Sequence, residues 1–195
     1  MVMKALEEKI LTEGTVLPGD ILKVGSFLNH QLDVNFLMEM GKEIARIYQG
    51  EQINKILTIE TSGIAIAVAA AAFMKVPVVF AKKNRSSNIN ADTYSIKIHS
   101  YTHNIDYDAV VSKDFLCAED RVLIIDDFLA NGQALNGLLN IIAQAGATPV
   151  GVAIAIEKGF QHGGDKLRAK GIRVESLAII DEMTNNTIKY RQQAG

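Results

Sequence analysis

The sequence has very little cysteine, no excess of charge of either sign, and no apolar run long enough to cross a membrane. Its single cysteine, Cys117, excludes an intramolecular disulfide and is typical of a reducing compartment. The most apolar run covers residues 64–74, well short of the ~20 residues that a membrane-spanning helix needs. Residues 1–14 contain Glu7, Glu8 and Lys9, which is not the pattern of a signal peptide. We therefore expect a cytoplasmic protein.

Charge and ligand spacing exclude further classes of protein. The 20 Lys and Arg residues against 22 Asp and Glu residues give a net charge of −2, which does not favour nucleic acid or an anionic membrane as a partner. His99 and His103 are four residues apart, but no Asp or Cys at a matching interval completes a metal site. We expect no nucleic-acid partner, no membrane partner and no metal site built from protein side chains alone.

Apolar strands and amphipathic helices alternate along most of the chain. We predict strands at 55–59, 76–81, 122–125, 149–156 and 172–180, and helices at 3–13, 34–49, 64–74, 134–145 and 164–170. Such alternation predicts an α/β fold, with a central, mostly parallel sheet flanked by helices. We see no repeat or linker, and expect residues 1–195 to form one domain. Residues 14–32 and the C-terminal segment are expected to form a small hood over the carboxyl edge of the sheet.

The most informative stretch covers residues 122–134. A fully apolar strand runs into the adjacent acids Asp126 and Asp127, and an Asn131-Gly132 turn then leads into a helix. Ligands of open parallel sheets bind at the carboxyl ends of strands, and the N–H groups of a helix N-terminus attract anions. Carboxylates can accept hydrogen bonds from sugar hydroxyls or face the water shell of Mg²⁺. This layout suits a phosphorylated ribose, whereas the simpler alternative is an acidic turn that caps a helix.

This pattern resembles the phosphoribosyl-diphosphate (PRPP) loop of the type I phosphoribosyltransferases. The resemblance implies that Asp126 and Asp127 form the catalytic acid pair that binds the ribose hydroxyls, and that the 5′-phosphate lies in a loop of Ala130, Asn131, Gly132, Gln133 and Ala134. Most members of the family have Thr at the position of Asn131 and Thr or Ser at that of Ala134. With Asn131 and Ala134 at these positions, the loop resembles that of the xanthine phosphoribosyltransferase branch of the family. The Asn131 side-chain amide can donate a hydrogen bond in place of the missing threonine hydroxyl.

Two further strand ends carry residues suited to a diphosphate. Thr61, Ser62 and Gly63 follow the strand at 55–59 and open a helix, while Lys82 and Lys83 follow the strand at 76–81. Taken alone, Ser62 is an ordinary helix cap and the lysines form a solvated basic turn. The family resemblance favours the diphosphate interpretation for all five residues.

The acceptor base is predicted from two separate segments. Lys158 donates only, which suits a carbonyl oxygen and favours a 6-oxopurine, and Phe160 offers a face for stacking. The alternative for Lys158 is an ordinary surface lysine. The resemblance adds Leu22 and Asn29 of the hood as contacts to xanthine. Related hypoxanthine-guanine enzymes place an Asp at the position of Ala130, so no general base is identified here.

The resemblance covers nearly the whole chain and implies a type I phosphoribosyltransferase fold with a long flexible loop at residues 86–113. It implies an enzyme of purine salvage, a homodimer, that transfers the phosphoribosyl group of PRPP to N9 of xanthine, with Mg²⁺ arriving on PRPP. The alternatives are an enzyme that prefers guanine or hypoxanthine, and a non-catalytic PRPP-binding purine regulator. Regulators of this fold carry an added DNA-binding domain, and no helix-turn-helix pattern precedes the first core strand.

Overall fold

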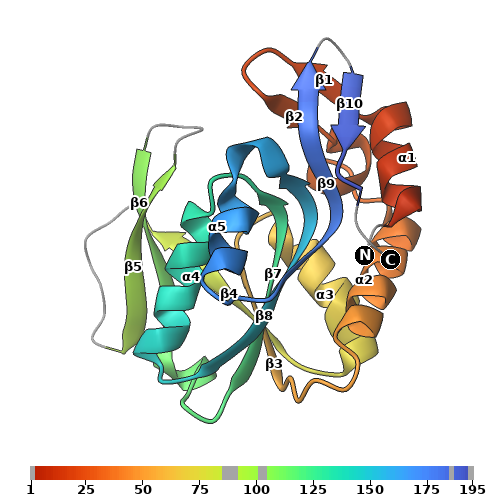
Figure 1. Cartoon of the computed structure of the whole chain (residues 1–195). Helices are drawn as coiled ribbons and strands as arrows, with labels where there is room; N and C mark the ends of the chain where they lie inside the picture. Colours follow the sequence, from red (N-terminus) through yellow and green to blue (C-terminus); the bar gives the residue numbers. More distant parts are fainter. Residues whose placement is uncertain (1–2, 85–91, 101–104, 185–186, 193–195) are drawn as a thin grey trace.

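A single eight-stranded sheet organises the molecule (Figure 1). The computed structural model describes residues 3–84, 92–100, 105–184 and 187–192. The strand order is β10-β9-β8-β7-β3-β4-β6-β5, in which the neighbours from β9 to β4 are parallel and the outer pairings are antiparallel. The strands are β3 (Lys55–Ile59), β4 (Val78–Asn84), β5 (Thr93–Ser100), β6 (Ile105–Ser112), β7 (Arg121–Leu129), β8 (Thr148–Lys158), β9 (Val174–Thr184) and β10 (Thr187–Tyr190).

Helices cover both faces of the sheet. They are α1 (Lys4–Glu13), α2 (Val34–Ile47), α3 (Gly63–Met74), α4 (Gln133–Gln144) and α5 (Gly163–Ala169). Asp33 caps α2, since its Oδ1 accepts a hydrogen bond of 3.1 Å from the Phe36 N–H. The predicted α/β fold with a mostly parallel sheet is confirmed, and the predicted helices agree with the structure to within two residues.

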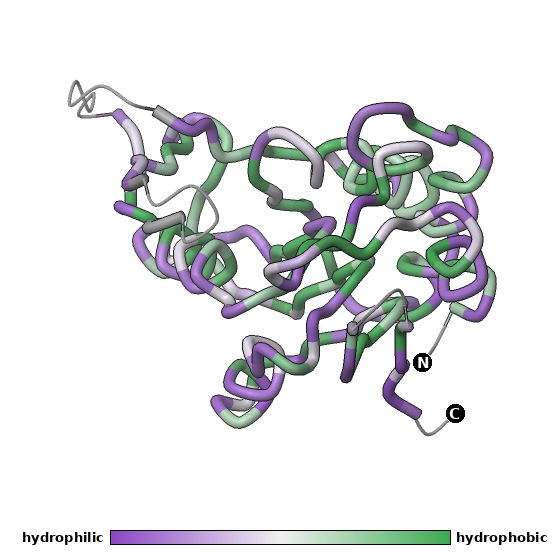
Figure 2. Tube along the Cα trace, turned by 90° about the horizontal axis from the view of Figure 1, so that it is seen from above, coloured by the Kyte–Doolittle hydropathy of each residue, from purple (hydrophilic) through white to green (hydrophobic). Residues whose placement is uncertain are grey.

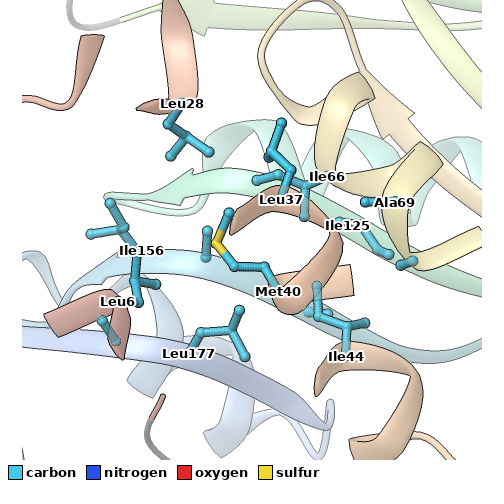
Figure 3. Packing of buried hydrophobic residues seen from close by; sticks show 14 of the residues in the cluster. Leu6, Leu28, Leu37, Met40, Ile44, Ile66, Ala69, Ile125, Ile156 and Leu177 are labelled. Carbon is cyan, nitrogen blue, oxygen red and sulfur yellow. The ribbon is translucent and has the colours of Figure 1, made fainter. Parts of the chain in front are cut away.

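Two hydrophobic clusters, one on each face, hold the layers together. Alternate residues of β7 belong to different clusters: Leu123 and Ile125 pack toward α2 and α3, while Val122 and Ile124 pack toward α4. Figure 3 shows the first cluster, in which Met40 lies among residues of other helices and strands. Hydrophobic segments run through the centre of the molecule in Figure 2. Burial on both faces explains why the central strands are almost wholly apolar.

Several strands extend beyond their apolar cores. The predicted strand at 122–125 continues to Leu129, so Asp126 and Asp127 lie within the strand rather than after it. The reason is pairing with the long strand β8, in which Phe128 lies opposite Ile156. In the same way β4 includes Lys82 and Lys83, because both pair with β6. Sheet pairing, and not hydrophobicity alone, sets where these strands end.

The segment that precedes α2 folds over one end of the sheet. It comprises the antiparallel hairpin of β1 (Thr15–Leu17) and β2 (Ile21–Lys23), followed by a π-helical turn, Gly25–Asn29. The hairpin lies beside the carboxyl end of β9 (Figure 1). Among the described residues no helix is both long enough and apolar enough to cross a membrane.

The predicted flexible loop at 86–113 is described only in part, because residues 85–91 and 101–104 lie outside the described residues. Its described part is the antiparallel pair β5–β6, which contains the alternating residues Tyr94–Ile98. β5 packs on α4, where the Gln144 amide donates to Ser95 O at 2.8 Å and accepts from Ser95 N at 3.3 Å. The edge of the sheet therefore carries a ribbon anchored to a core helix.

Candidate active site

A cavity of about 640 Å³ lies between the hood and the carboxyl ends of the parallel strands. Seven residues predicted for PRPP or base binding line it: Leu22, Asn29, Ala130, Asn131, Gln133, Ala134 and Lys158. These residues come from the hood, the turn before α4 and the end of β8. The fold thus brings together segments that are more than a hundred residues apart in the sequence.

The predicted phosphate loop is held by its own backbone and by α5. Gly132 has φ +87°, a left-handed conformation that favours glycine, and Asn131 Oδ1 accepts a hydrogen bond of 3.2 Å from the Gln133 N–H. From the other side, Gly163 packs so closely that a Cβ there would lie 2.8 Å from the Gly132 nitrogen. The loop precedes α4, whose first N–H groups form a ready site for an anion.

The acid pair combines burial with the absence of a counterion. Asp126 is 5% exposed, Asp127 is half-buried, and the Asp127 N–H donates to Asp126 Oδ1 at 3.0 Å. Burial raises the pKa of Asp126 well above that of an ordinary aspartate, and the neighbouring Asp127 adds to the rise. No cation among the described residues forms an ion pair with either carboxylate. The pair can therefore accept hydrogen bonds from a ligand.

The turn Thr61–Ser62–Gly63 lies directly beside the acid pair but does not line the main cavity. The Ser62 side chain makes no capping hydrogen bond to α3, so the simple cap interpretation does not hold. Gly63 packs against β7, and a Cβ at this position would lie 2.8 Å from Asp126 Oδ1. The turn places backbone N–H groups next to the acids, as a diphosphate site requires.

The two predicted lysines lie on opposite faces of β4. Lys83 lies on the side of the acids: its Nζ is 5.3 Å from the centre of the Tyr107 ring, and its charge acts on Asp126. Lys82 lines a different, more apolar cavity of about 620 Å³ that includes Phe80. Because successive side chains of a strand alternate between faces, Lys82 and Lys83 point to opposite sides of β4, and it is the charge of Lys83 that acts on Asp126.

Lys158 lies at the end of β8, where the hood meets the sheet. Its Nζ donates to Asp20 O at 2.7 Å and lies 5.7 Å from the centre of the Phe128 ring. Burial lowers the pKa of Lys158 below that of an ordinary lysine. In the described part of the chain it has no ion-pair partner, so its ammonium group faces the cavity with donors to spare.

Of the two phenylalanines at this end of the sheet, Phe128 lines the cavity and Phe160 does not. Both rings pack against the first hydrophobic cluster, but only Phe128 also lines the cavity, beside Lys158. Ile98 and Tyr107 of the ribbon and Gln161 also line it, and none of these was predicted. The signal for Phe128 was its place two residues after Asp126, which becomes informative only once β7 is known to extend past the acids.

Comparisons with known proteins agree with this geometry. Residues 27–186 match the model of the family described as "Phosphoribosyl transferase domain". The chain is 54% identical to xanthine phosphoribosyltransferase of Alkaliphilus metalliredigens (189 residues, 97% of this chain, 94% of the relative). It is 52% identical to that of Clostridioides difficile (190 residues, 97% and 100%). The crystal structure of Giardia lamblia APRTase with 9-deazaadenine shares the fold, with a TM-score of 0.77, 21% identity and coverage of 94% and 99%.

Proposed function

The chain belongs to the phosphoribosyltransferase family, and on this premise we propose that it is the enzyme that transfers the 5-phosphoribosyl group of PRPP to N9 of xanthine. The products are xanthosine 5′-monophosphate and diphosphate, in purine salvage. Relatives named xanthine phosphoribosyltransferase, at 52–54% identity over 97% of this chain, support the reaction. The observation that carries the proposal is the cavity that joins the phosphate loop to Lys158, Asn29 and Leu22.

PRPP would lie along the carboxyl ends of β3 and β7. The N–H groups of the turn from Ala130 to Ala134 hold the 5′-phosphate, and Asp126 and Asp127 accept hydrogen bonds from the ribose hydroxyls. The turn 61–63 and the Lys83 ammonium group bind the diphosphate. Mg²⁺ enters as part of the PRPP complex, and the acids, which form no ion pair with any described cation, suit its water shell. When bound, Mg²⁺ neutralises charge on the departing diphosphate.

Xanthine would lie between the hood and the end of β8. The Lys158 ammonium group donates to a purine carbonyl oxygen, and Asn29 can both donate and accept, as a 2-oxo group and its adjacent N–H require. Phe128 offers an aromatic face and Leu22 an apolar one, both lining the same cavity. Adenine lacks the carbonyl that Lys158 requires, so this set of contacts favours 6-oxopurines.

The residues of this chain act by holding the reactants and stabilising the departing charge. Xanthine, as the anion that has lost its imidazole-ring proton to solvent, attacks C1 of the ribose through N9 while the bond from C1 to diphosphate breaks, and positive charge develops on the sugar ring in the transition state. Fixed N–H donors at the turn 61–63 and the charge of Lys83 favour departure of the diphosphate. The phosphate loop and the hood hold sugar and base in line, which lowers the entropic cost of the encounter.

The proposal extends to the organisation of the protein as a single-domain cytoplasmic homodimer. One sheet carries both hydrophobic clusters, which supports one domain. The single cysteine supports a reducing compartment.

Phe80 and Phe115, 39% and 61% exposed, lie on an apolar surface that supports association of two copies. Sedimentation equilibrium measures the assembly: a mass of one chain at micromolar concentration rules out the dimer.

Diphosphate release with PRPP and Mg²⁺ tests the reaction, with xanthine, guanine, hypoxanthine, adenine and uracil in separate assays. Turnover with xanthine well above the other bases supports the proposal. Preference for guanine or hypoxanthine keeps the PRPP site and overturns the base assignment. If no base is turned over while calorimetry still detects PRPP binding, the protein is a PRPP-binding regulator and not an enzyme.

A further inference from the structure

Thr58 combines full burial with an unused hydroxyl. Its side chain is 0% exposed in β3, and its Oγ1 has no hydrogen-bond partner. Among the described residues it is the only buried side-chain nitrogen or oxygen in this state. Buried polar atoms are nearly always paired, because an unpaired one destabilises the fold. Valine has the same shape without that cost, so the hydroxyl requires an explanation outside the stability of the free protein.

The hydroxyl faces the place where the acid pair and the diphosphate turn meet. The position that a Cβ of Gly63 would occupy lies against both Thr58 Oγ1 and Asp126 Oδ1, at 2.8 Å from the latter. β3 and β7 are parallel neighbours, paired through Leu57 and Ile124, which brings their carboxyl ends together. The acceptor of the proposed site that shares this position with Thr58 Oγ1 is thus Asp126 Oδ1, called here the inner oxygen of that carboxylate.

That inner oxygen already receives one donor from the backbone. The Asp127 N–H donates to Asp126 Oδ1 at 3.0 Å, and an ionised carboxylate oxygen has room for a second hydrogen bond. The outer face of the carboxylate is left for a ligand. A donor on the inner side would fix the rotation of the carboxylate about its χ2 bond, without competing with the sugar.

We propose that Thr58 is a positioning residue, whose hydroxyl donates to the Asp126 carboxylate when PRPP is bound and so orients that carboxylate toward the ribose hydroxyls. This inference deepens the proposed function and rests on it. It explains why the sequence keeps a buried hydroxyl that has no described partner in the free protein: the hydrogen bond to Asp126 forms only when PRPP is bound.

The test compares Thr58→Val with Thr58→Ser. Thr58→Val keeps the shape and removes the donor, and we expect its Kd for PRPP, measured by calorimetry, and its KM for PRPP to rise about tenfold. The KM for xanthine should stay within about twofold, because the base contacts are untouched. The urea midpoint of Thr58→Val should be unchanged or higher, since the unpaired hydroxyl is gone. Thr58→Ser, which keeps the donor, should recover most of the PRPP affinity.

Ile59→Val is the matched control, because it alters packing in the same strand without touching a donor. We expect it to lower the urea midpoint and leave the Kd for PRPP unchanged. Equal PRPP affinity in Thr58→Val and wild type overturns the inference. The inference is also overturned if Thr58→Val has a lower urea midpoint and binds PRPP and xanthine more weakly to the same extent, because that result indicates a purely structural role.

The wild-type protein separates failure of this inference from failure of the proposed function. PRPP affinity is measured without any base, so the Thr58 comparison stands even if the acceptor is not xanthine. A wild type that binds no PRPP refutes the proposed function and the inference together. If wild type binds PRPP and Thr58→Val binds it equally tightly, the inference is refuted but the proposed function is not.

Discussion

The two ends of β7 each carry a buried aspartate, and the two aspartates are in opposite electrostatic states. Asp120, just before the strand, and Asp126, within it, are both 5% exposed. Burial would raise the pKa of Asp120, but hydrogen bonds from Lys55 Nζ at 2.7 Å and the Cys117 N–H at 2.8 Å outweigh it and lower that pKa. Within the described ranges no cation forms an ion pair with Asp126, and burial raises its pKa.

The difference separates an acid that serves the fold from one that serves a ligand. At the amino end of the sheet the charges satisfy each other within the protein, and Lys55 also donates to Phe115 O at 2.8 Å. At the carboxyl end Asp126 is left with one backbone donor, and Thr58 with no partner among the described residues. Two equally buried aspartates can therefore have different roles, and whether the carboxylate has a cationic partner within the protein indicates which role each one has.

The largest expected effect is on the activity of Asp126→Asn. The amide cannot replace a carboxylate that accepts hydrogen bonds from ribose hydroxyls, so kcat/KM for PRPP should fall about 100-fold or more. Steady-state diphosphate release at saturating xanthine measures it. Full activity in this variant would remove the acid pair from the ribose site.

Asp120→Asn should sharpen the comparison from the other end. Removing the carboxylate leaves Lys55 without its ion-pair partner, and we expect the free energy of unfolding at pH 7 to fall by about 2 kcal/mol. Because folding lowers the pKa of Asp120, its stabilisation is present above its unfolded pKa and is lost as the pH falls through the folded value. The difference from wild type in urea unfolding should therefore shrink in strong acid.

The activity of Asp120→Asn serves as the matched control for Asp126→Asn. Both variants remove one buried carboxylate, but Asp120 lies just before β7, at the end away from the cavity. Its kcat and its KM for both substrates should stay within about twofold of wild type. A loss as large as that of Asp126→Asn would show that the two ends of the strand are not functionally distinct.

Two lysines repeat the contrast on a smaller scale. Lys55 is paired with a carboxylate, whereas the polar and ring contacts of Lys158 in the described part of the chain are the Asp20 carbonyl and the Phe128 ring. Lys158→Ala should raise the KM for xanthine about tenfold and leave the KM for PRPP within about twofold. Lys166→Ala, at an exposed position of α5, is the control and should change neither. An unchanged KM for xanthine in Lys158→Ala would exclude Lys158 from the base site.

Sequence patterns predicted the layers of the fold and the place of the acid pair, because both depend on local regularities. Apolar runs located every parallel strand, and the Asn131-Gly132 turn located the start of α4. Strand ends were less predictable: β7 continues through two charged residues because β8 pairs with it there. The apolar run ends at Ile125, so the sequence pattern alone does not show that Phe128 belongs to the same strand.

The other missed contacts depend on long-range pairing. Tyr107 and Ile98 reach the cavity only because β6 pairs with β4 and β5 packs on α4. Lys82 and Lys83 are neighbours in sequence, yet the alternation of a strand sends them to different faces. That alternation becomes informative only when β4 is known to extend through both lysines.

The most direct measurement is equilibrium urea unfolding of Asp126→Asn and wild type at pH 7.5 without substrate. A raised folded pKa means that the ionised carboxylate destabilises the fold at neutral pH. The account therefore predicts that Asp126→Asn is more stable than wild type, by about 1 kcal/mol, while it is nearly inactive. A loss of stability like that expected for Asp120→Asn would contradict the account, since Asp126 would then be a structural acid.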